Sequence, residues 1–475
     1  MSNAVELPRF LISAARKSSG KTTLTIGLCA AFARRGLSVQ PFKKGPDYID
    51  PMWLSAASGQ PCRNLDFNTQ SRDEITRMFG EHQSDISVIE GNKGLHDGMD
   101  LKGSDSTAGL ASLLKTPVVL VLNVQGITRG VAPLILGSTS VQPQVNLAGV
   151  ILNMVAGDRH AGKLQAAVEH YTDVPVLGCV RADPKMSIDE RHIGLIPANE
   201  MAVANAKVDA IADLVTRQVD LDALLEVGRL APALDIAPAT PRTRPRADVR
   251  IGVAQDSAFG FYYKDDLEAF ENAGCEVVPI DTLSDQYLPE IDGLFIGGGF
   301  PETQAAALEK NLSLRSEIRT AIQNDLPTYA ECGGLMYLSR SITWQGMRHE
   351  MVGAIPGDSV MHARPQGRGY VKLSETGKGP WPLRDPVGRP TVFAAHEFHY
   401  SSLDNFEGEY PFAFRVIRGK GIDGKSDGTV VHNLVAGFAH LRDVEANRWV
   451  GRFVDFVRAC REGVQPANAR TGSGS

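Results

Sequence analysis

The first segment whose residue types and spacing could do chemistry is a phosphate-binding loop. Residues 15–22 read Ala-Arg-Lys-Ser-Ser-Gly-Lys-Thr, with alanine where such loops usually begin with glycine. The loop follows a predicted strand over 9–14 and precedes a predicted helix over 24–35, which is the context that the motif requires. Backbone N–H groups and the helix N-terminus would bind phosphate oxygens. We therefore expect Gly20, Lys21 and Thr22 to bind ATP, with Lys21 on the terminal phosphates and the Thr22 hydroxyl on Mg²⁺.

Carboxylates follow two further predicted strands. Glu90 ends the apolar run 86–90, and Asp47 and Asp50 lie in the Gly-Pro loop after the run 38–43. Ligands of open parallel sheets bind at the carboxyl ends of the strands, so we expect Glu90 to bind Mg²⁺, directly or through water. Asp47 and Asp50 could position a substrate or hold a second Mg²⁺. Taken alone, their loop fits a solvated turn equally well.

A second reactive segment reads Ala-Glu-Cys-Gly-Gly-Leu-Met, in which Cys332 follows a predicted strand and precedes a helix-compatible run. Small neighbours permit the sharp turn of a nucleophile elbow, and a helix N-terminus behind the sulfur favours the thiolate. The glycine run 297–299 follows another predicted strand, and we expect the N–H groups of Gly298 and Gly299 to form an oxyanion hole. A general base is also required, and the residues alone leave four candidates open: His396, His399, His432 and His440.

These segments need a scaffold of alternating strands and helices to position them. Short runs rich in Val, Ile and Leu alternate with amphipathic stretches, as in a parallel sheet that is covered on both faces. The same rhythm starts again at residue 249, and the end of the chain is richer in β-structure from about residue 353. The fold class is therefore α/β, with two such domains. The predicted strands are 9–14, 38–43, 86–90, 117–123, 147–153 and 175–180, then 249–254, 276–279, 293–296 and 327–330.

A proline-rich segment marks the boundary between the two domains. Its prolines at 232, 238, 241 and 245 interrupt helix and strand alike. We expect a first domain over 1–229, a linker over 230–248, a second domain over 249–462 and a flexible tail over 463–475.

The composition excludes several classes of protein. The chain has 475 residues, of which 43% are hydrophobic and 22% charged, and its formal net charge is −6. The mildly acidic balance argues against a nucleic-acid partner, and the lack of a run of about 18 apolar residues argues against a membrane span. The six cysteines form no CxxC pair, and the first residues show no leader pattern. We expect a cytoplasmic protein with reduced thiols.

Several motifs, in order along the chain, resemble the cobyrinate a,c-diamide synthase family of glutamine-dependent tetrapyrrole amide synthases. The resemblance covers nearly the whole chain. It implies a dethiobiotin-synthetase-like phosphate-loop NTPase domain joined to a class I glutamine amidotransferase-like domain. The motifs are GPDYIDP at 45–51, the strand-end segment 90–98, RHIGLIPANE at 191–200, AECGGLMYL at 330–338 and HEFHYS at 396–401.

The resemblance also implies a reaction. ATP and Mg²⁺ would convert the peripheral acetate carboxylates a and c of a tetrapyrrole, such as cobyrinate or hydrogenobyrinate, into acyl phosphates. Ammonia released from L-glutamine would then displace phosphate and leave an amide. The family further implies a homodimer. The residues that the resemblance assigns are the nucleophile Cys332, its base His440, the substrate-loop residues Asp47, Tyr48 and Asp50, the metal ligands Thr22 and Glu90, and an adenine contact from Asn153.

The sequence departs from the family pattern in two places. The glutamate that usually follows the histidine of an amidotransferase by two residues is replaced by Arg442, so His440 acts in a dyad or with another acid. The segments 92–96 and 361–370 are closer to the branch proposed to amidate siroheme or sirohydrochlorin for a sulfite-reductase cofactor. That branch is the alternative substrate class.

An alternative from another class is a partition-type switch ATPase that carries a degenerate amidotransferase domain. Such ATPases have a lysine five positions before the loop lysine, where this chain has Arg16. The intact Cys-Gly-Gly elbow at 332–334 also disfavours a degenerate second domain.

Overall fold

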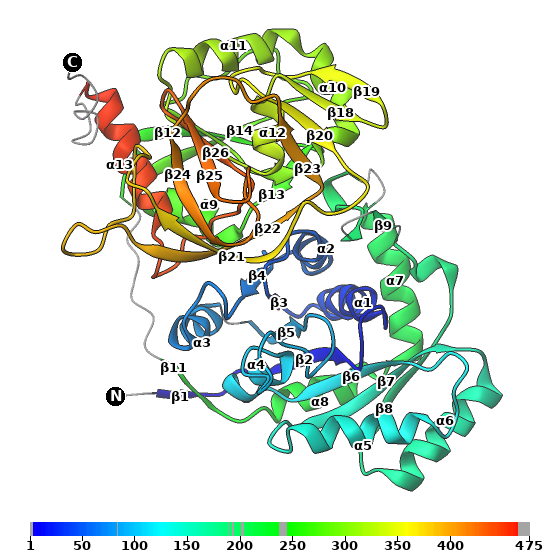
Figure 1. Ribbon diagram of the computed structural model, residues 1–475. Helices are drawn as coiled ribbons and strands as arrows, with labels where there is room; N and C mark the ends of the chain where they lie inside the picture. The colour runs from blue at the N-terminus through cyan, green and yellow to red at the C-terminus, as the bar shows by residue number, and fades with distance from the viewer. Residues whose placement is uncertain are drawn as a thin grey trace. The chain divides into compact units, whose positions relative to one another are not determined.

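The computed structural model describes residues 3–82, 84–188, 190–191, 194–200, 204–236 and 245–463. Two compact units divide the chain, at 1–240 and 241–475. Each unit is α/β, as the sequence predicted, and each is organised around its own sheet (Figure 1). No described helix is long and apolar enough to cross a bilayer.

The first unit is built on a seven-stranded sheet in which every neighbouring pair is parallel. Its central strands are completely buried and consist mainly of apolar residues, which suits a sheet covered by helices on both faces. All six strands predicted from the sequence are present, with ends that differ by at most two residues. In sheet order the strands are β4 (Arg63–Leu65), β3 (Val39–Lys44), β5 (Ile86–Glu90), β2 (Arg9–Ala14), β6 (Val118–Asn123), β7 (Leu147–Val155) and β8 (Val176–Arg181).

Helices cover this sheet on two sides. Helix α1 packs against α2 and α7, whereas α3, α4, α5 and α6 contribute side chains to another core cluster together with the strands (Figure 1). Serine side chains accept hydrogen bonds at the starts of α3 and α4, which satisfies N–H groups that lack helical partners. The helices are α1 (Lys21–Arg34), α2 (Ile49–Ser58), α3 (Arg72–Glu81), α4 (Thr107–Leu113), α5 (Val131–Val141), α6 (Asp158–Tyr171), α7 (Ala204–Gln218) and α8 (Leu221–Arg229).

The first unit extends beyond the boundary at 229 that the sequence predicted. A short strand β11 (Leu234–Ile236) pairs antiparallel with β1 (Asn3–Val5), and the side chains of Leu234 and Ile236 are buried in the core. The buried guanidinium of Arg9 donates to the backbone oxygens of Leu114 at 2.9 Å and Pro232 at 2.6 Å. The start of the predicted linker is therefore structured, because β1 offers it a hydrogen-bonding edge. Residues 237–244 of that linker lie outside the described residues.

The second unit has a nine-stranded mixed sheet. Its first five strands are parallel neighbours, and each later neighbour is antiparallel, which agrees with the β-rich end predicted from about residue 353. In sheet order the strands are β14 (Cys275–Ile280), β12 (Val249–Ala254), β15 (Gly293–Ile296), β17 (Thr328–Glu331), β26 (Leu434–Gly437), β25 (Ser426–Val431), β24 (Phe412–Arg418), β21 (Gly367–Glu375) and β22 (Val392–His399).

Helices and two smaller sheets complete the second unit. Core clusters join the large sheet to α11 and α12 on one side and to α9 and α13 on the other (Figure 1). A two-stranded ribbon pairs β13 (Phe259–Phe261) with β16 (Gly298–Gly299), and a four-stranded sheet runs β19 (Met347–Glu350), β18 (Ser341–Trp344), β20 (Asp358–Met361), β23 (Ser401–Asp404). The helices are α9 (Lys264–Asn272), α10 (Ala305–Lys310), α11 (Leu312–Gln323), α12 (Gly333–Leu338) and α13 (Trp449–Arg461). The predicted tail lies outside the described residues from 464 onward.

Candidate functional site

The phosphate loop lies between β2 and α1, where the sequence placed it. Gly20 caps α1 with a φ of 87°, a left-handed conformation that favours glycine. A Cβ atom on Gly20 would lie only 2.2 Å from Nδ2 of Asn153, which is near the end of β7. The same amide nitrogen donates a hydrogen bond of 2.9 Å to the Ser19 oxygen. Asn153 therefore holds the loop backbone in the structure, and its expected contact with adenine stays a prediction.

Lys21 and Thr22 start α1 beside the carboxylate that ends β5. The Thr22 hydroxyl donates to Oε1 of Glu90 at 2.6 Å and to Oδ2 of Asp50 at 3.3 Å. Lys21 is 8% exposed, and its burial lowers the pKa of the ammonium. The nearby Glu90 charge raises this pKa and offsets only part of the effect of burial. The strand order puts β5 next to β2, so the loop residue and the carboxylate come from adjacent strand ends.

Lys43, which the sequence analysis did not single out, lies at the centre of this group. Its ammonium pairs with Asp50 and lies 3.1 Å from Oε1 of Glu90 and 3.7 Å from Oδ2 of Asp47. Burial alone would lower the pKa of Lys43, but the three carboxylates around it raise it well above its ordinary value. The charged ammonium is therefore the stable form at neutral pH.

The loop 45–50 is ordered and is not a solvated turn. Oδ1 of Asp47 accepts the N–H groups of Ile49 and Asp50 at 3.0 and 3.1 Å, and Asn64 donates to the Asp47 backbone oxygen at 2.7 Å. Tyr48 is 8% exposed. Burial, and then the charge of Asp50, raise the pKa of Asp47 to about 7. Asp50 accepts the Thr22 hydroxyl and, like Glu90, pairs with Lys43, whereas Asp47 accepts the first N–H groups of α2.

The arrangement fits a Mg²⁺ ion that binds together with nucleotide phosphates. Oε2 of Glu90 is buried and has no hydrogen-bond partner within the described part of the chain, and burial raises the pKa of this carboxyl group. No set of three or more His, Cys, Asp or Glu among the described residues could hold a metal ion by itself. Mg²⁺ commonly uses one or two carboxylates and completes its shell with phosphate oxygens and water. Thr22, Asp50 and Glu90 offer oxygens of this kind.

In the second unit, Cys332 occupies a sharp turn between β17 and α12. Its φ of 48° and ψ of −103° lie in a region that side-chain-bearing residues rarely adopt. A Cβ on Gly334 would lie 2.1 Å from the Ile296 backbone oxygen, so α12 can leave the strand this steeply only with glycine at that position. The predicted elbow is therefore present, and the side chain of Cys332 is 7% exposed.

The two expected oxyanion glycines form β16 beside this elbow. A Cβ on Gly333 would lie 3.0 Å from the Gly299 nitrogen, and a Cβ on Gly298 would lie 2.6 Å from Cε1 of His440. The glycine backbone thus approaches both the elbow and the imidazole. Backbone N–H groups in this place can stabilise a developing oxyanion, so Gly298 and Gly299 remain the proposed residues of the oxyanion hole.

Of the four candidate histidines, His440 has a hydrogen bond to the cysteine in the described structure. Its imidazole forms side-chain hydrogen bonds with Cys332 and Glu331. Burial by itself lowers the pKa of His440, and these two partners outweigh burial and raise it to about 10. Of the others, His396 stacks on His440 with ring centroids 4.8 Å apart, His399 stacks on Phe438, and His432 is exposed.

Arg442, at the position where the usual glutamate is missing, is directed elsewhere. Its guanidinium is 1% exposed, pairs with Oδ2 of Asp265 at 2.7 Å and lies 4.7 Å above the centre of the Tyr263 ring. The acid that contacts His440 is Glu331, the residue directly before Cys332. The sequence analysis missed Glu331, although its position inside the quoted AECGG motif was the available signal.

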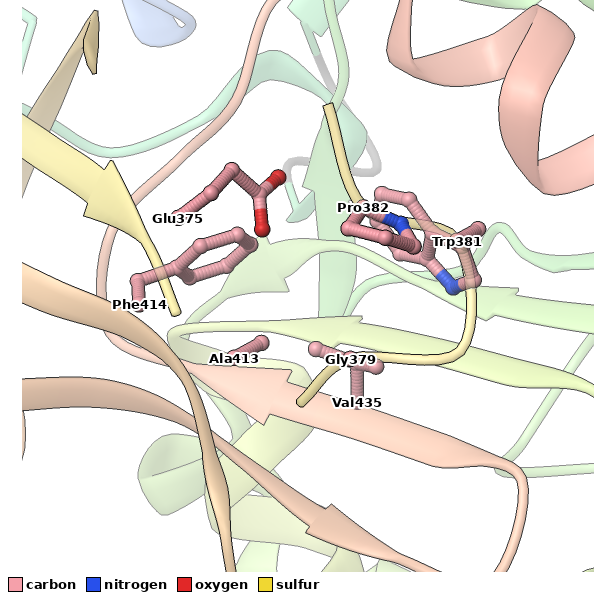
Figure 2. Close-up of a pocket in the computed structure, with 7 residues that line it drawn as sticks. All are labelled: Glu375, Gly379, Trp381, Pro382, Ala413, Phe414 and Val435. Atoms are coloured by element: carbon pink, nitrogen blue, oxygen red, sulfur yellow. The ribbon is translucent and has the colours of Figure 1, made fainter. Parts of the chain in front are cut away.

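A narrow pocket with no room for a water molecule also lies in the second unit. Figure 2 shows Glu375 and Phe414 on one side of it and Trp381 and Pro382 on the other. None of the site residues lines this cavity. Oε1 of Glu375 accepts the Leu383 N–H at 2.8 Å, while Oε2 and the indole N–H of Trp381 have no hydrogen-bond partner in the described structure. Burial raises the pKa of Glu375 to about 7.

Comparisons with known proteins agree with this division into two sites. Residues 11–195 match the family model described as the CobQ/CobB/MinD/ParA nucleotide binding domain, and residues 250–446 match the CobB/CobQ-like glutamine amidotransferase domain. A relative from Magnetococcus marinus named cobyrinate a,c-diamide synthase is 44% identical over 95% of this chain and 97% of its own. Relatives with the same name from Methanosarcina acetivorans and Archaeoglobus fulgidus are each 40% identical, over 95% of this chain and 96% and 97% of theirs.

Proposed function

The chain belongs to the cobyrinate a,c-diamide synthase family and is a glutamine-dependent carbon–nitrogen ligase that uses ATP, and we propose that it amidates the a and c acetate carboxylates of cobyrinate or hydrogenobyrinate. The observation that carries the proposal is the presence in one chain of two chemically distinct sites. One is the phosphate loop with Thr22 hydrogen-bonded to Glu90, and the other is the Cys332 elbow hydrogen-bonded to His440.

The first site supplies the activation that amide formation needs. A carboxylate does not react with ammonia at neutral pH. The substrate carboxylate therefore attacks the γ-phosphorus of ATP, the bond to the β,γ-bridging oxygen breaks, ADP leaves, and an acyl phosphate forms. Lys21 and the loop N–H groups hold the transferring phosphoryl group and neutralise charge on it. Mg²⁺, held through Thr22, Asp50 and Glu90, would add charge stabilisation on the phosphate oxygens. Lys43 keeps the three carboxylates together and near the loop.

The second site releases ammonia from glutamine. The Cys332 sulfur attacks the carboxamide carbon, and a thioester forms as ammonia leaves. The N–H groups of Gly298 and Gly299 support the tetrahedral oxyanion. Ammonia then attacks the acyl phosphate, which yields the amide and inorganic phosphate. Asp47 and Tyr48, in the ordered loop beside the first site, are the proposed contacts to the macrocycle.

The test is mass spectrometry of the products after incubation of the purified protein with ATP, Mg²⁺ and glutamine. Parallel reactions contain cobyrinate, hydrogenobyrinate, sirohydrochlorin or siroheme. We expect two successive carboxylate-to-amide conversions, each a loss of about 1 Da, with cobyrinate or hydrogenobyrinate. Conversion of siroheme or sirohydrochlorin alone would overturn the proposed substrate and assign the chain to the siroheme branch. No conversion of any macrocycle would overturn tetrapyrrole amidation itself.

A further inference from the structure

Glu331, the acid directly before Cys332, faces His440 because two neighbouring strands end side by side. Strand β17 pairs with β26 in parallel, with Glu331 opposite Gly437, and His440 follows three residues after β26 ends. The Cys332 N–H also bonds to the Gly437 oxygen at 2.8 Å. Two adjacent strand ends therefore deliver the nucleophile, the acid and the base to one place.

The elbow conformation brings two consecutive side chains to the same imidazole. In a regular strand, Glu331 and Cys332 would point to opposite faces of the sheet. The positive φ of Cys332 breaks this alternation, and both side chains contact His440. Nδ1 of His440 lies 3.2 Å from Oε2 of Glu331, which leaves Nε2 for the sulfur.

The Glu331 carboxylate is held rigidly by two further donors. Its Oε1 accepts the Leu441 N–H at 2.7 Å and the Tyr329 hydroxyl at 2.7 Å. Glu331 and His440 are each 3% exposed, so water competes little for this contact. Hydrogen bonds to the other carboxylate oxygen fix the direction in which Oε2 faces His440.

Among the described residues, the other charged and polar groups near His440 have partners of their own. His396 stacks on it as a second imidazole, with its Nδ1 3.3 Å from the Tyr263 hydroxyl. Asp427 is occupied by the N–H groups of Phe438 and Ala439, at 3.0 and 2.9 Å. Arg442, two residues after His440, pairs with Asp265 and carries the wrong charge for the role.

We propose that Glu331 is the positioning acid of the glutaminase site, which orients the His440 imidazole toward Cys332 and stabilises its protonated form in place of the glutamate that Arg442 replaces. The inference rests on the proposed function, because it refines the glutamine-hydrolysing half of that reaction. His440 already holds the proton taken from the thiol when the sulfur attacks, and it gives that proton to the departing nitrogen. In the second step it takes a proton from the water that cleaves the thioester and returns a proton to the sulfur.

The test measures glutamine hydrolysis to glutamate by the full-length protein across pH 6 to 10, for Glu331→Gln and Glu331→Asp. Replacing the acid that orients the histidine of a serine-protease triad by its amide lowers kcat about 10⁴-fold, so we expect E331Q to lower kcat by at least about 100-fold with little change in KM. We also expect the pH midpoint of the rate to fall by at least one unit, because the imidazolium loses its counter-charge. Glu331→Asp should restore part of both effects.

Two matched variants separate this role from a general loss of structure. Tyr329→Phe removes one of the two donors that hold Glu331 and keeps its carboxylate, so kcat should fall less than in E331Q and the pH midpoint should stay in place. Glu375→Gln removes another buried carboxylate of the same unit and should leave the pH midpoint in place. An E331Q protein with an unshifted midpoint and kcat within twofold of wild type would overturn the inference and leave the proposed function intact. A wild-type protein without glutaminase activity would instead contradict the proposed function.

If E331Q does not fold, NMR of the wild-type and Glu331→Asp proteins with ¹⁵N-labelled histidine tests the same contact. A strongly deshielded Nδ1 proton of His440 in the wild-type protein would show the contact with the carboxylate. Loss or a shift of this resonance in Glu331→Asp supports the positioning role of Glu331. An Nδ1 resonance that Glu331→Asp leaves unchanged would overturn it.

Discussion

The Cβ position of Gly20 lies 2.2 Å from Nδ2 of Asn153, so the end of the phosphate loop and the end of β7 fit together only with glycine in the loop. The asparagine then satisfies the Ser19 oxygen with the same nitrogen. The phosphate loop after β2 is thus held by a side chain of β7, which lies two strands away from β2 in the sheet. The first prediction follows from this contact.

Asn153→Ala should weaken ATP binding without affecting glutamine hydrolysis. The variant leaves the Ser19 oxygen without its donor, and a buried unsatisfied group costs about 1–3 kcal/mol. If the loop loses that much order, the Kd for ATP rises about tenfold, which corresponds to about 1.4 kcal/mol. Titration calorimetry with ATP checks this, and glutaminase activity serves as the internal control. An unchanged Kd would show that the loop keeps its conformation without this amide.

Lys21→Ala and Cys332→Ser should have complementary effects. Lys21→Ala removes the cation that holds the transferring phosphoryl group, so amidation should be lost whether glutamine or ammonia is supplied, while glutamine hydrolysis continues. Cys332→Ser should abolish the use of glutamine and retain amidation with free ammonium chloride. Amide formation measured by mass spectrometry with each nitrogen source separates the two. Normal use of glutamine by the serine variant would show that the nucleophile is another residue.

Asp50→Asn and Asp47→Asn should differ, although the two carboxylates come from one loop. Asp50 accepts from Thr22 and pairs with Lys43, so its loss should raise the Mg²⁺ concentration for half-maximal amidation about tenfold. Asp47 caps α2 and lies farther from Lys43 than Asp50 does, with Oδ2 3.7 Å from the ammonium, so its variant should bind ATP and Mg²⁺ normally and lose amidation at the substrate step. Mg²⁺ titrations of both variants provide the comparison. The same Mg²⁺ shift in both would remove the distinction between a metal side and a substrate side.

Gly334→Ala should disable the elbow, and Gly451→Ala is its matched control. The added methyl group at 334 would meet the Ile296 oxygen at 2.1 Å, and a backbone atom of a central strand cannot move aside. We expect loss of glutaminase activity of at least 100-fold or failure of the second unit to fold. At Gly451, inside α13, nothing lies within 4 Å of the added carbon, and alanine should stabilise the helix by up to about 1 kcal/mol. Thermal unfolding and glutaminase assays check both variants. A G334A protein of normal activity would contradict the geometry of this turn.

Glu375→Gln should remove a pH-dependent loss of stability. Burial raises the pKa of Glu375 from 4.5 to about 7. Below pH 4.5 the folded and unfolded chains both carry the proton, and between pH 4.5 and 7 only the folded chain keeps it. The contribution of Glu375 to stability therefore falls as pH rises through this window, by roughly 3 kcal/mol in total, and stays constant above it.

Urea unfolding at pH 5, 6, 7 and 8, followed by tryptophan fluorescence, measures this difference. The free energy of unfolding of E375Q minus that of wild type should increase from pH 5 to pH 7 and then level off. A difference that does not change with pH would show that Glu375 titrates normally in the folded protein.

The sequence was sufficient for the parts of the structure that depend on local pattern. Apolar runs identified the strands, and the loop before Lys21 and the glycines after Cys332 identified the two turns. The role of Glu331 could not be read in this way, because regular alternation places it on the opposite face from Cys332, and only the turn geometry reverses that. Lys43 was missed because a lysine in a strand is usually exposed at its tip, whereas here three carboxylates stabilise it in a buried position. The pairing of β11 with β1 joins residues more than 200 positions apart, and the prolines around it indicated a linker.

The pairing of β11 with β1 determines where this chain can be cut without disturbing the first unit. Because Asn3 pairs with Ile236 and the Arg9 guanidinium bonds to the Pro232 oxygen, the first and last described segments of the first unit lie side by side. A break in the chain after Ile236 would leave these contacts intact. Gene fission or fusion at this point would therefore separate or join a nucleotide-binding protein and a glutamine amidotransferase protein without altering the interior of the first.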